Sequence, residues 1–326
     1  MYKFITALII GILIAVSFFV MSQHSPFQKH YNIGIITLTD VDQMTINGLK
    51  DKLSELDYRE GDNITYYYDG PIVNMEENFQ KRVVSLRKNH LDLIFVSSTP
   101  ASIAIKKEFS NSKIPILFCP VSDPIAAGLV ESLKKPGANI TGVKLVNGED
   151  QRLKWFKELV PDLQSLYVPY TFDDKGALAS IEQITPIAKN LGITLHLKGF
   201  TESQEDQTAI FTYAKGSDAI FMPRDSRLES RIELFVHYTL EHKIPLSAPS
   251  FLQVEKGALF SYGHVHYELG KQAGRMAHQI FSGIPPDKIP VELAENQFVL
   301  NVATAKKINL KLPDYIIKQA DYVIKE

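Results

Sequence analysis

The sequence predicts an α/β protein with two Rossmann-like lobes, each containing a mainly parallel sheet, joined by a hinge. Short apolar, β-branched segments alternate with segments of helical periodicity from residue 31 to about residue 283. This alternation is typical of βαβ units, whose strands are parallel. It occurs in two consecutive sets. Without its apolar N-terminus the chain still has about 300 residues, which favours two domains over one core.

The first set begins with a buried strand and a helix. In residues 43–56, apolar side chains recur at helical spacing with charged side chains between them. A turn at 60–63 separates this helix from the next strand. The expected strands are 31–37, 64–68, 91–96, 114–118 and 141–145, and the expected helices are 43–56, 76–89, 102–109 and 125–133.

The second set repeats this architecture without a detectable sequence repeat. The expected strands are 165–170, 194–200, 219–222, 245–248 and 258–262, and the expected helices are 151–159, 176–191, 204–214, 228–243 and 267–282. The lobe boundary is expected near 143–145, with returns near Gly263 and near 284–286. The expected first lobe is therefore 28–144 plus about 264–284, and the second lobe is 145–263 plus about 285–326.

The first 27 residues form a separate segment. Lys3 precedes an apolar run at 4–21, which is typical of a signal peptide or of a retained membrane anchor. Both alternatives place the rest of the chain in the periplasm or elsewhere outside the cytoplasm. The single cysteine, Cys119, lies far from this leader, so the sequence does not predict a lipoprotein.

Composition and motifs disfavour several functional classes. The net charge is −2 and no basic tract is present, so we do not expect a nucleic-acid partner. The sequence has no Gly-rich phosphate loop and no Gly-x-Ser-x-Gly motif, so we expect neither an enzyme nor a bound cofactor. His264 and His266 have the spacing of a metal-binding pair, but no carboxylate or cysteine lies at a supporting interval, so we expect no metal.

In the first lobe, polar residues follow the ends of several expected strands. Ligands bind beyond the carboxyl ends of parallel strands, where hydroxyls and helix N-termini suit an anionic group. The same hydroxyls are also common helix caps, and an acid before a proline is typical of a cap. The first-lobe candidates are Thr39, Asp40, Ser97, Ser98, Thr99, Ser122 and Asp123.

In the second lobe, three further candidates follow expected strands. Tyr170 could stack on a ligand ring or pack at the edge of the lobe. Arg224 and Asp225 could pair with each other, or they could bind a ligand carboxylate and a ligand amine, respectively. We expect Asp225 to be the principal second-lobe contact.

Several segments, taken in order, resemble a known family. They are Ser-Ser-Thr-Pro-Ala at 97–101, Val-Ser-Asp-Pro-Ile-Ala-Ala-Gly-Leu-Val at 121–130, Asn-Ile-Thr-Gly-Val at 139–143, Asp-Ala-Ile-Phe-Met-Pro-Arg-Asp at 218–225 and Gly-Ala-Leu-Phe-Ser-Tyr-Gly at 257–263, with matches continuing to 313. Together they resemble the ABC-transporter substrate-binding proteins that include tryptophan- and tyrosine-binding members. The resemblance implies a type I periplasmic-binding fold that closes like a Venus flytrap.

The chain departs from the family pattern in loops expected to face the cleft. Residues 37–42 stand where members often carry a His-Pro pair, and Arg224 stands where a second proline is usual. The strand end at 167–170 is also unusual. The resemblance therefore implies the fold and leaves the identity of the ligand open.

The resulting hypothesis is an extracytoplasmic solute-binding protein of an ABC importer. We expect it to be a monomer that binds an amino acid or a related zwitterion between its lobes and docks on a membrane permease. The alternative is a sensing domain, tethered by the leader, that passes closure to a signalling partner.

Overall fold

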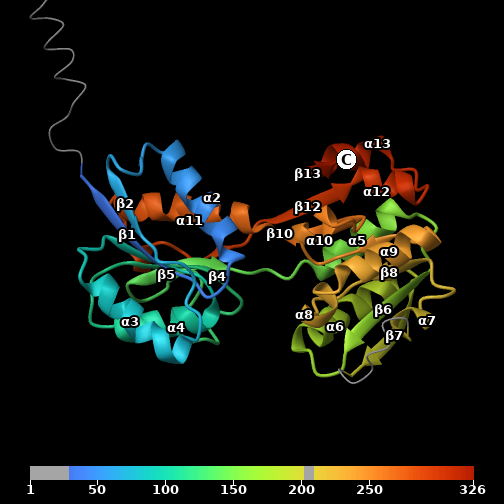
Figure 1. Cartoon of the computed structure of the whole chain (residues 1–326), viewed down its shortest axis with the longest axis horizontal. Helices are drawn as coiled ribbons and strands as arrows, with labels where there is room; N and C mark the ends of the chain where they lie inside the picture. The colour runs from blue at the N-terminus through green and yellow to red at the C-terminus, as the bar shows by residue number, and fades with distance from the viewer. Residues whose placement is uncertain (1–28, 202–208) are drawn as a thin grey trace, which may run out of the picture.

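The computed structural model describes residues 29–201 and 209–326, so the expected leader lies outside the described residues. The described chain forms two α/β lobes side by side, joined by three extended connections (Figure 1). Each lobe is built on one sheet with helices on both faces, and the expected α/β class is confirmed. Within the described residues, no helix is long and apolar enough to cross a membrane.

The first lobe contains a six-stranded sheet in the order β11-β5-β4-β3-β1-β2, and all its strand pairs are parallel. Its four central strands are apolar and mostly buried, as expected for a parallel sheet covered on both faces, while the two edge strands are partly exposed. The strands are β1 (Tyr31–Ile36), β2 (Ile64–Tyr67), β3 (Leu93–Val96), β4 (Ile116–Val121), β5 (Ile140–Lys144) and β11 (Glu292–Leu293).

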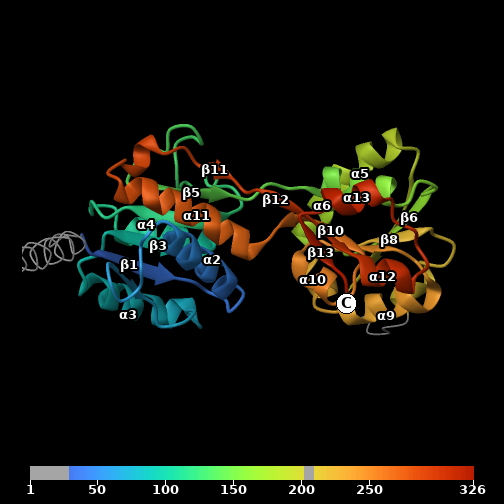
Figure 2. The ribbon, with the colours of Figure 1, turned by 90° about the horizontal axis from the view of Figure 1, so that it is seen from above.

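Two helices cover each face of this sheet. On one face, α2 (Asp42–Glu55) packs with α11 (His266–Phe281), and Leu49, Leu269 and Met276 share one apolar cluster. On the other face, α3 (Met75–Arg87) and α4 (Thr99–Glu108) pack on a second cluster. Figures 1 and 2 both show α11 beside α2, although the two helices are far apart in sequence.

The second lobe contains a seven-stranded sheet in the order β13-β12-β10-β9-β8-β6-β7. All its strand pairs are parallel except β10 with β12. The strands are β6 (Ser165–Thr171), β7 (Thr194–Phe200), β8 (Ala219–Phe221), β9 (Leu246–Ser247), β10 (Phe260–His264), β12 (Asn296–Asn301) and β13 (Tyr322–Ile324).

Apolar clusters on both faces of the second sheet hold its helices in place. Most of these helices are short, and within the described residues only α5, α6 and α9 are longer than two turns. The helices are α5 (Glu149–Leu159), α6 (Lys175–Asn190), α7 (Ala209–Thr212), α8 (Ser226–Glu229), α9 (Ile232–His242), α10 (Phe251–Glu255), α12 (Val302–Lys307) and α13 (Asp314–Gln319).

The chain passes between the lobes after β5, after β10 and between β11 and β12 (Figure 2). The expected third crossing near 284–286 is wrong. After α11 the chain stays with the first lobe through the 3-10 turn Pro286–Lys288, Thr141 donates a hydrogen bond to the Ile289 carbonyl, and β11 pairs with β5. The crossing therefore comes about ten residues later, at 294–295.

Two expected helices differ from the structure. Residues 125–133 form turns, because Gly128 adopts a positive φ of 66° and the Pro124 carbonyl accepts from the backbone of Leu129 and Val130. The expected helix 228–243 is divided into α8 and α9. At the break, Ser230 donates its hydroxyl to the Arg227 carbonyl, an interaction that competes with the helical backbone pattern.

The expected helix at 204–214 lies partly outside the described residues, and its described part contains α7. The elements α10, β11, β12, α12, α13 and β13 were not expected from periodicity. They are two to six residues long, too short to show a helical or alternating pattern.

Candidate functional site

The carboxyl ends of both sheets face the junction between the lobes. β5 and β10 each run directly into a connection to the other lobe, so their carboxyl ends lie at the junction. Neighbouring parallel strands end at the same edge of a sheet. The loops after β1, β3 and β4 therefore lie on the first-lobe side of the junction, and those after β6, β8 and β9 lie on the second-lobe side.

In the first lobe, a buried carboxylate connects the loops after β1 and β3. Asp42 Oδ2 accepts from the backbone N–H and the hydroxyl of Thr39, and Oδ1 accepts from the Ser97 hydroxyl at 2.5 Å. Thr39 and Ser97 thus lie together, but their hydroxyls are engaged within the protein. Asp40 is exposed next to them.

Ser98 and Thr99 begin α4. The Ser98 side chain caps the helix by accepting from Ala101 N, and its backbone has a positive φ of 79°. A non-glycine residue in this region is strained and persists only where the surroundings hold it. The Ser102 hydroxyl donates to the Ser98 carbonyl at 2.6 Å, which contributes to holding it. Both Ser98 and Thr99 are half-buried.

The loop after β4 also has a capping residue. Asp123 Oδ1 accepts from the backbone of Ile125 and Ala126, so the capping alternative describes this side chain. Ser122 is exposed, and its carbonyl accepts from Lys144 Nζ at 3.0 Å. Lys144 was not a candidate. Its position near the carboxyl end of the expected strand 141–145 was the signal that could have identified it.

An aromatic pair lies at the end of β6 and in the loop that follows it. Tyr170 is half-buried and lies edge-to-face with Phe172, which is 53% exposed, at a centroid distance of 5.7 Å. Asp174 caps α6 through Ala177 N, and Asp173 pairs with Arg227. An exposed aromatic surface beside a strand end is compatible with stacking on a ligand ring.

Asp225 differs from its expected role. The side chain is fully buried, Oδ2 accepts from Thr171 N, and Oδ1 accepts from Arg227 N and Leu228 N. It therefore joins the end of β6 to the start of α8. In this conformation the carboxylate is not presented to a ligand amine, and the pairing of Arg224 with Asp225, which was one of the two alternatives, does not form.

Arg224 instead pairs with a carboxylate that the sequence analysis missed. Its Nε donates to Glu149 Oε1 at 3.0 Å, and Glu149 is completely buried. The other Glu149 oxygen accepts from Arg152, which is also completely buried and stacks over the Phe221 ring at 3.9 Å. Residues 149–152 show the charge pattern of a solvated first turn, so no local signal indicates their burial.

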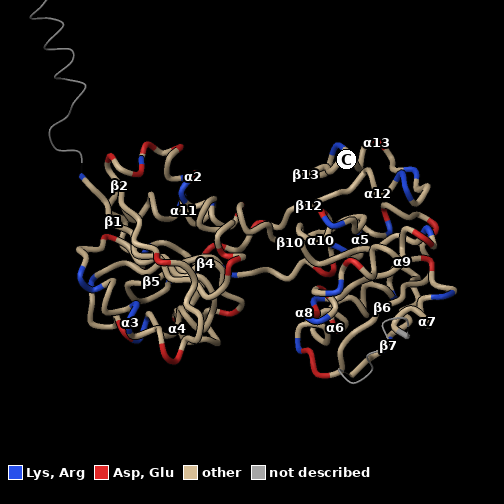
Figure 3. Tube along the Cα trace, in the orientation of Figure 1, with Lys and Arg blue, Asp and Glu red and all other residues tan. Residues whose placement is uncertain are grey.

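Two more ionisable groups lie near this cluster. Burial raises the pKa of Glu229 to about 7, although Arg224 and Arg152 oppose the shift, and Gln253 donates to its Oε2. Burial lowers the pKa of His264 to about 3, with Arg224 and His266 adding to the shift. The His264 ring is therefore neutral at physiological pH. Figure 3 shows basic and acidic residues close together around α6 and α8.

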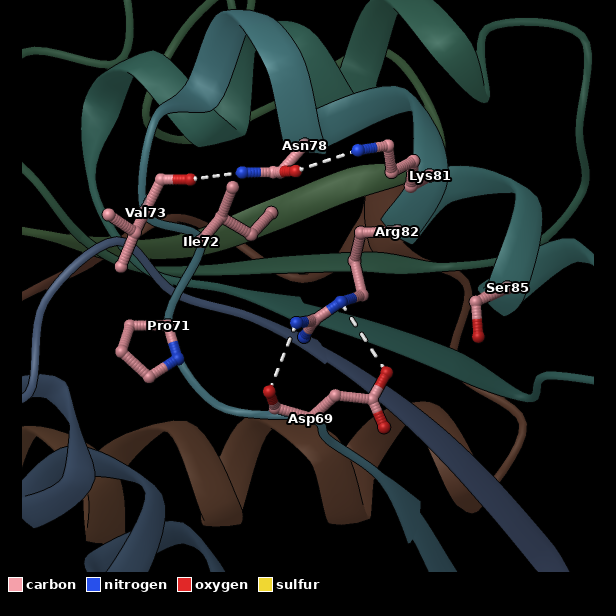
Figure 4. A pocket seen from close by; sticks show the side chains of 8 residues that line it. All are labelled: Asp69, Pro71, Ile72, Val73, Asn78, Lys81, Arg82 and Ser85. Atoms are coloured by element: carbon pink, nitrogen blue, oxygen red, sulfur yellow. Dashed lines mark hydrogen bonds and ion pairs between the residues drawn. The ribbon is translucent and has the colours of Figure 1, made fainter.

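A hollow of about 360 Å³ lies elsewhere, between α3 and the loop after β2 (Figure 4). Its charged side chains are paired, since Arg82 donates to the carbonyls of Asp69 and Gly70 and lies 3.5 Å from the Asp69 carboxylate. None of the ten expected site residues lines it. The junction between the lobes is therefore the stronger candidate site.

Within the described part of the chain, no hydrogen bond or ion pair joins expected site residues of one lobe to those of the other. A contact between the lobes does occur beside the crossings, where Tyr322 of β13 donates to Glu268 of α11 at 2.6 Å. Among the described residues, the two halves of the candidate site are therefore not connected by hydrogen bonds or ion pairs between these residues.

A family model described as ABC transporter substrate binding protein matches residues 32–324 of the chain. A tyrosine-binding protein from Clostridioides difficile is 29% identical over 289 residues, covering 87% of this chain and 82% of that protein.

Two solved structures share the architecture. The ligand-free, open structure of a substrate-binding protein with adhesive properties from Clostridium difficile is 28% identical, with a TM-score of 0.76 and coverage of 91% of this chain and 100% of that chain. An ABC domain from Streptococcus pneumonia in complex with L-Trp is 25% identical, with a TM-score of 0.67 and the same coverage.

Proposed function

Since the chain belongs to the family of ABC transporter substrate-binding proteins, we propose that it captures a small solute between its lobes and delivers it to a membrane permease. The observation that carries the proposal is the placement of both sets of strand ends at one junction crossed by three connections. A hinge of this kind lets two half-sites close on a ligand from opposite sides. The protein works outside the cytoplasm and performs no chemistry on the solute.

The ligand in this proposal is an amino acid or a related small molecule. The names of the tyrosine-binding relative and of the L-Trp complex support this class. The capped N-terminus of α4 at Ser98 and Thr99 supplies a positive dipole end on the first-lobe side. The Tyr170–Phe172 pair supplies an aromatic surface on the second-lobe side.

The open arrangement supports a role in capture. The TM-score is higher to the ligand-free, open relative than to the L-Trp complex, at equal coverage of this chain. An open ground state exposes both half-sites to solvent, and a ligand that contacts both lobes favours the closed state through its greater affinity for that state.

The test is ligand screening by thermal shift. The full chain, purified in mild detergent, is unfolded to remove bound solute, refolded, and heated with amino acids, sugars, nucleosides and small carboxylates. A solute present at one hundred times its Kd adds about 2.7 kcal/mol to the free energy of unfolding, enough to raise Tm by several degrees. Cooperative melting without a shift from any solute would contradict capture of these ligands and would favour a tethered sensor with a protein input.

A further inference from the structure

The second-lobe half-site contains an arginine whose orientation is fixed from behind. Arg224 follows β8, and its Nε donates to the buried Glu149 carboxylate. The second oxygen of that carboxylate is engaged by Arg152, which also donates to the Met222 carbonyl at 2.8 Å. Because a buried and doubly paired carboxylate holds the Nε side, the guanidinium presents its other edge in a defined direction.

That other edge is unpaired among the described residues. Arg224 Nη2 is buried without a hydrogen-bond partner, while 23% of the side chain remains exposed. A Cβ atom added at Gly263 would lie 3.3 Å from Nη2, so the guanidinium lies against the end of β10, where the chain crosses to the first lobe. A buried N–H group without a partner is unfavourable and rare in native structures.

Other unpartnered polar atoms occur on the neighbouring strands β9 and β10 and on α5. Ser247 Oγ at the end of β9, His264 Nδ1 at the end of β10, and Nε and Nη1 of Arg152 are all buried without hydrogen-bond partners in the described residues. The strands β8, β9 and β10 are neighbours in the sheet. This side of the junction therefore has more hydrogen-bonding capacity than its own residues satisfy.

The charges in this cluster favour an anion. The two guanidiniums of Arg152 and Arg224 share the Glu149 carboxylate, and the Asp225 carboxylate faces backbone N–H groups instead. Glu229 is largely buried beside the cluster and hydrogen-bonded by Gln253. A ligand ammonium placed here would meet a guanidinium edge, whereas a carboxylate would find two parallel N–H donors.

We propose that the second lobe selects solutes with a carboxylate group, and that Arg224 binds this carboxylate through its Nη1–Nη2 edge while Glu149 holds the guanidinium in place. This inference rests on the proposed function and names the class of solute that the second half-site recognises. Arg224 is thus a specificity-determining residue.

The experiment compares each acid with its uncharged amide. The full chain in mild detergent is titrated by calorimetry with L-tyrosine, L-tryptophan, L-glutamate and succinate, and with the carboxamides and the decarboxylated amines of the solutes that bind. We expect the wild-type chain to prefer the acid over the amide by at least thirtyfold. In Arg224→Gln this preference falls to less than threefold, and Arg224→Lys retains part of it because a lysine offers charge without the planar fork.

Arg227→Gln is the matched control, because Arg227 lies three residues away and is paired with Asp173. We expect it to leave the acid-to-amide ratio within twofold of wild type. The ratio reports on recognition and is insensitive to a loss of stability that affects both ligands alike. If Arg224→Gln does not fold, the acid-to-amide ratio can still be measured with Arg224→Lys.

The outcomes separate the two proposals. If the wild-type chain binds none of these solutes in either form, the proposed function fails for this class and the inference fails with it. If it binds a solute and the acid-to-amide ratio is the same in Arg224→Gln as in wild type, the Arg224 assignment is overturned while solute binding stands.

Discussion

Asp225 is a buried carboxylate that connects two loops on the second-lobe side of the junction. It accepts hydrogen bonds from Thr171 N at 2.7 Å, Arg227 N at 3.1 Å and Leu228 N at 3.2 Å. These contacts fix the end of β6 relative to α8. Arg224, the neighbouring residue, is therefore positioned by contacts on both sides.

We expect Asp225→Ala to lower the free energy of unfolding by about 3 kcal/mol, because three backbone N–H groups lose their acceptor in a buried setting. Urea denaturation of the ligand-free chain measures the loss. Asp173→Ala, which removes an exposed carboxylate in the same loop region, is the control and should leave the unfolding midpoint unchanged. Equal midpoints for wild type and Asp225→Ala would show that these contacts contribute little.

Glu229 makes stability depend on pH. Burial raises its pKa from 4.5 to about 7, and the groups facing it are Arg224, Arg152, Glu149 and Gln253. The folded chain keeps a proton that the unfolded chain loses between pH 4.5 and 7. Taken alone, Glu229 therefore lowers the free energy of unfolding by about 3 kcal/mol as pH rises across this window. We expect Glu229→Gln to abolish this fall, measured by denaturant titrations between pH 4.5 and 8. An unchanged pH profile would contradict the raised pKa.

His264 contributes a pH dependence of the opposite sign. Burial lowers its pKa from 6.5 to about 3, so below pH 6.5 the unfolded chain binds a proton that the folded chain does not. The free energy of unfolding therefore falls as pH is lowered from 6.5 toward 3. Between pH 4.5 and 6.5 this effect opposes that of Glu229. In His264→Gln, we expect the free energy of unfolding to fall steadily as pH rises through that range. In Glu229→Gln, we expect it to rise instead. Parallel profiles for the two variants would refute this assignment.

The sequence identified positions at this scale better than it identified contacts. Ser98, Thr99, Arg224 and the loop around Asp40 do lie at strand ends on the junction, because parallel topology places them there. The partners of Arg224 could not be predicted. Glu149 is 75 residues away, and its burial depends on how α5 packs beside β8, which no local pattern encodes.

At the scale of elements, two glycines allow α2 and α11 to approach closely. A Cβ atom added at Gly48 would lie 1.9 Å from the Tyr267 carbonyl oxygen, and one added at Gly270 would lie 2.0 Å from the Thr45 carbonyl oxygen. Both contacts are with backbone, which cannot move aside as a side-chain end can. The helix that follows the second crossing, α11, is thereby held against α2.

We expect Gly270→Ala to force the two helices apart and to lower the free energy of unfolding by at least 2 kcal/mol. Gly61→Ala is the matched control. No atom lies within 4 Å of its added Cβ, but its φ of 85° carries backbone strain, so a loss of about 1 kcal/mol is expected. Thermal unfolding of both variants gives the comparison. A smaller loss for Gly270→Ala than for Gly61→Ala would show that the interface can adapt.

The two longest helices were predicted correctly, and the short C-terminal elements were not predicted. The sixteen-residue helices α6 and α11 match their expected ranges within a residue or two, because an amphipathic pattern over four turns is distinctive. Residues 125–133 have a similar apolar spacing, but the positive φ of Gly128 diverts the chain into turns. The C-terminal elements are too short to carry a period, so only their tertiary pairing defines them.

At the scale of the whole molecule, the open arrangement predicts closure on binding. A solute that shifts Tm should also reduce the radius of gyration measured by small-angle X-ray scattering, because ligand contacts to both lobes favour the closed state. A solute that does not shift Tm, added at the same concentration, is the control. Binding without a change in the radius of gyration would show that the ligand occupies one lobe only.

The two-lobed architecture follows from the alternation of strands and helices, and that prediction is confirmed. The position of the third crossing was wrong because Gly283 and the prolines at 285 and 286 end a helix without indicating which lobe the chain joins next. That choice depends on the pairing of β11 with β5. A two-residue strand gives no sequence signal of its partner.

The three crossings also determine the order in which the lobes can be completed during synthesis. The first lobe consists of residues before 145 together with the segment from α11 to β11, and the second lobe contributes most of its strands in between. Until residues 266–281 emerge from the ribosome, the apolar surface of α2 that packs against Leu269 and Met276 has no cover. The first lobe is therefore completed only after most of the second lobe has been made, and β12 and β13 then complete the second lobe. A nascent chain of this topology keeps an unfinished apolar face over most of its translation, which favours its remaining unfolded until the whole polypeptide is available.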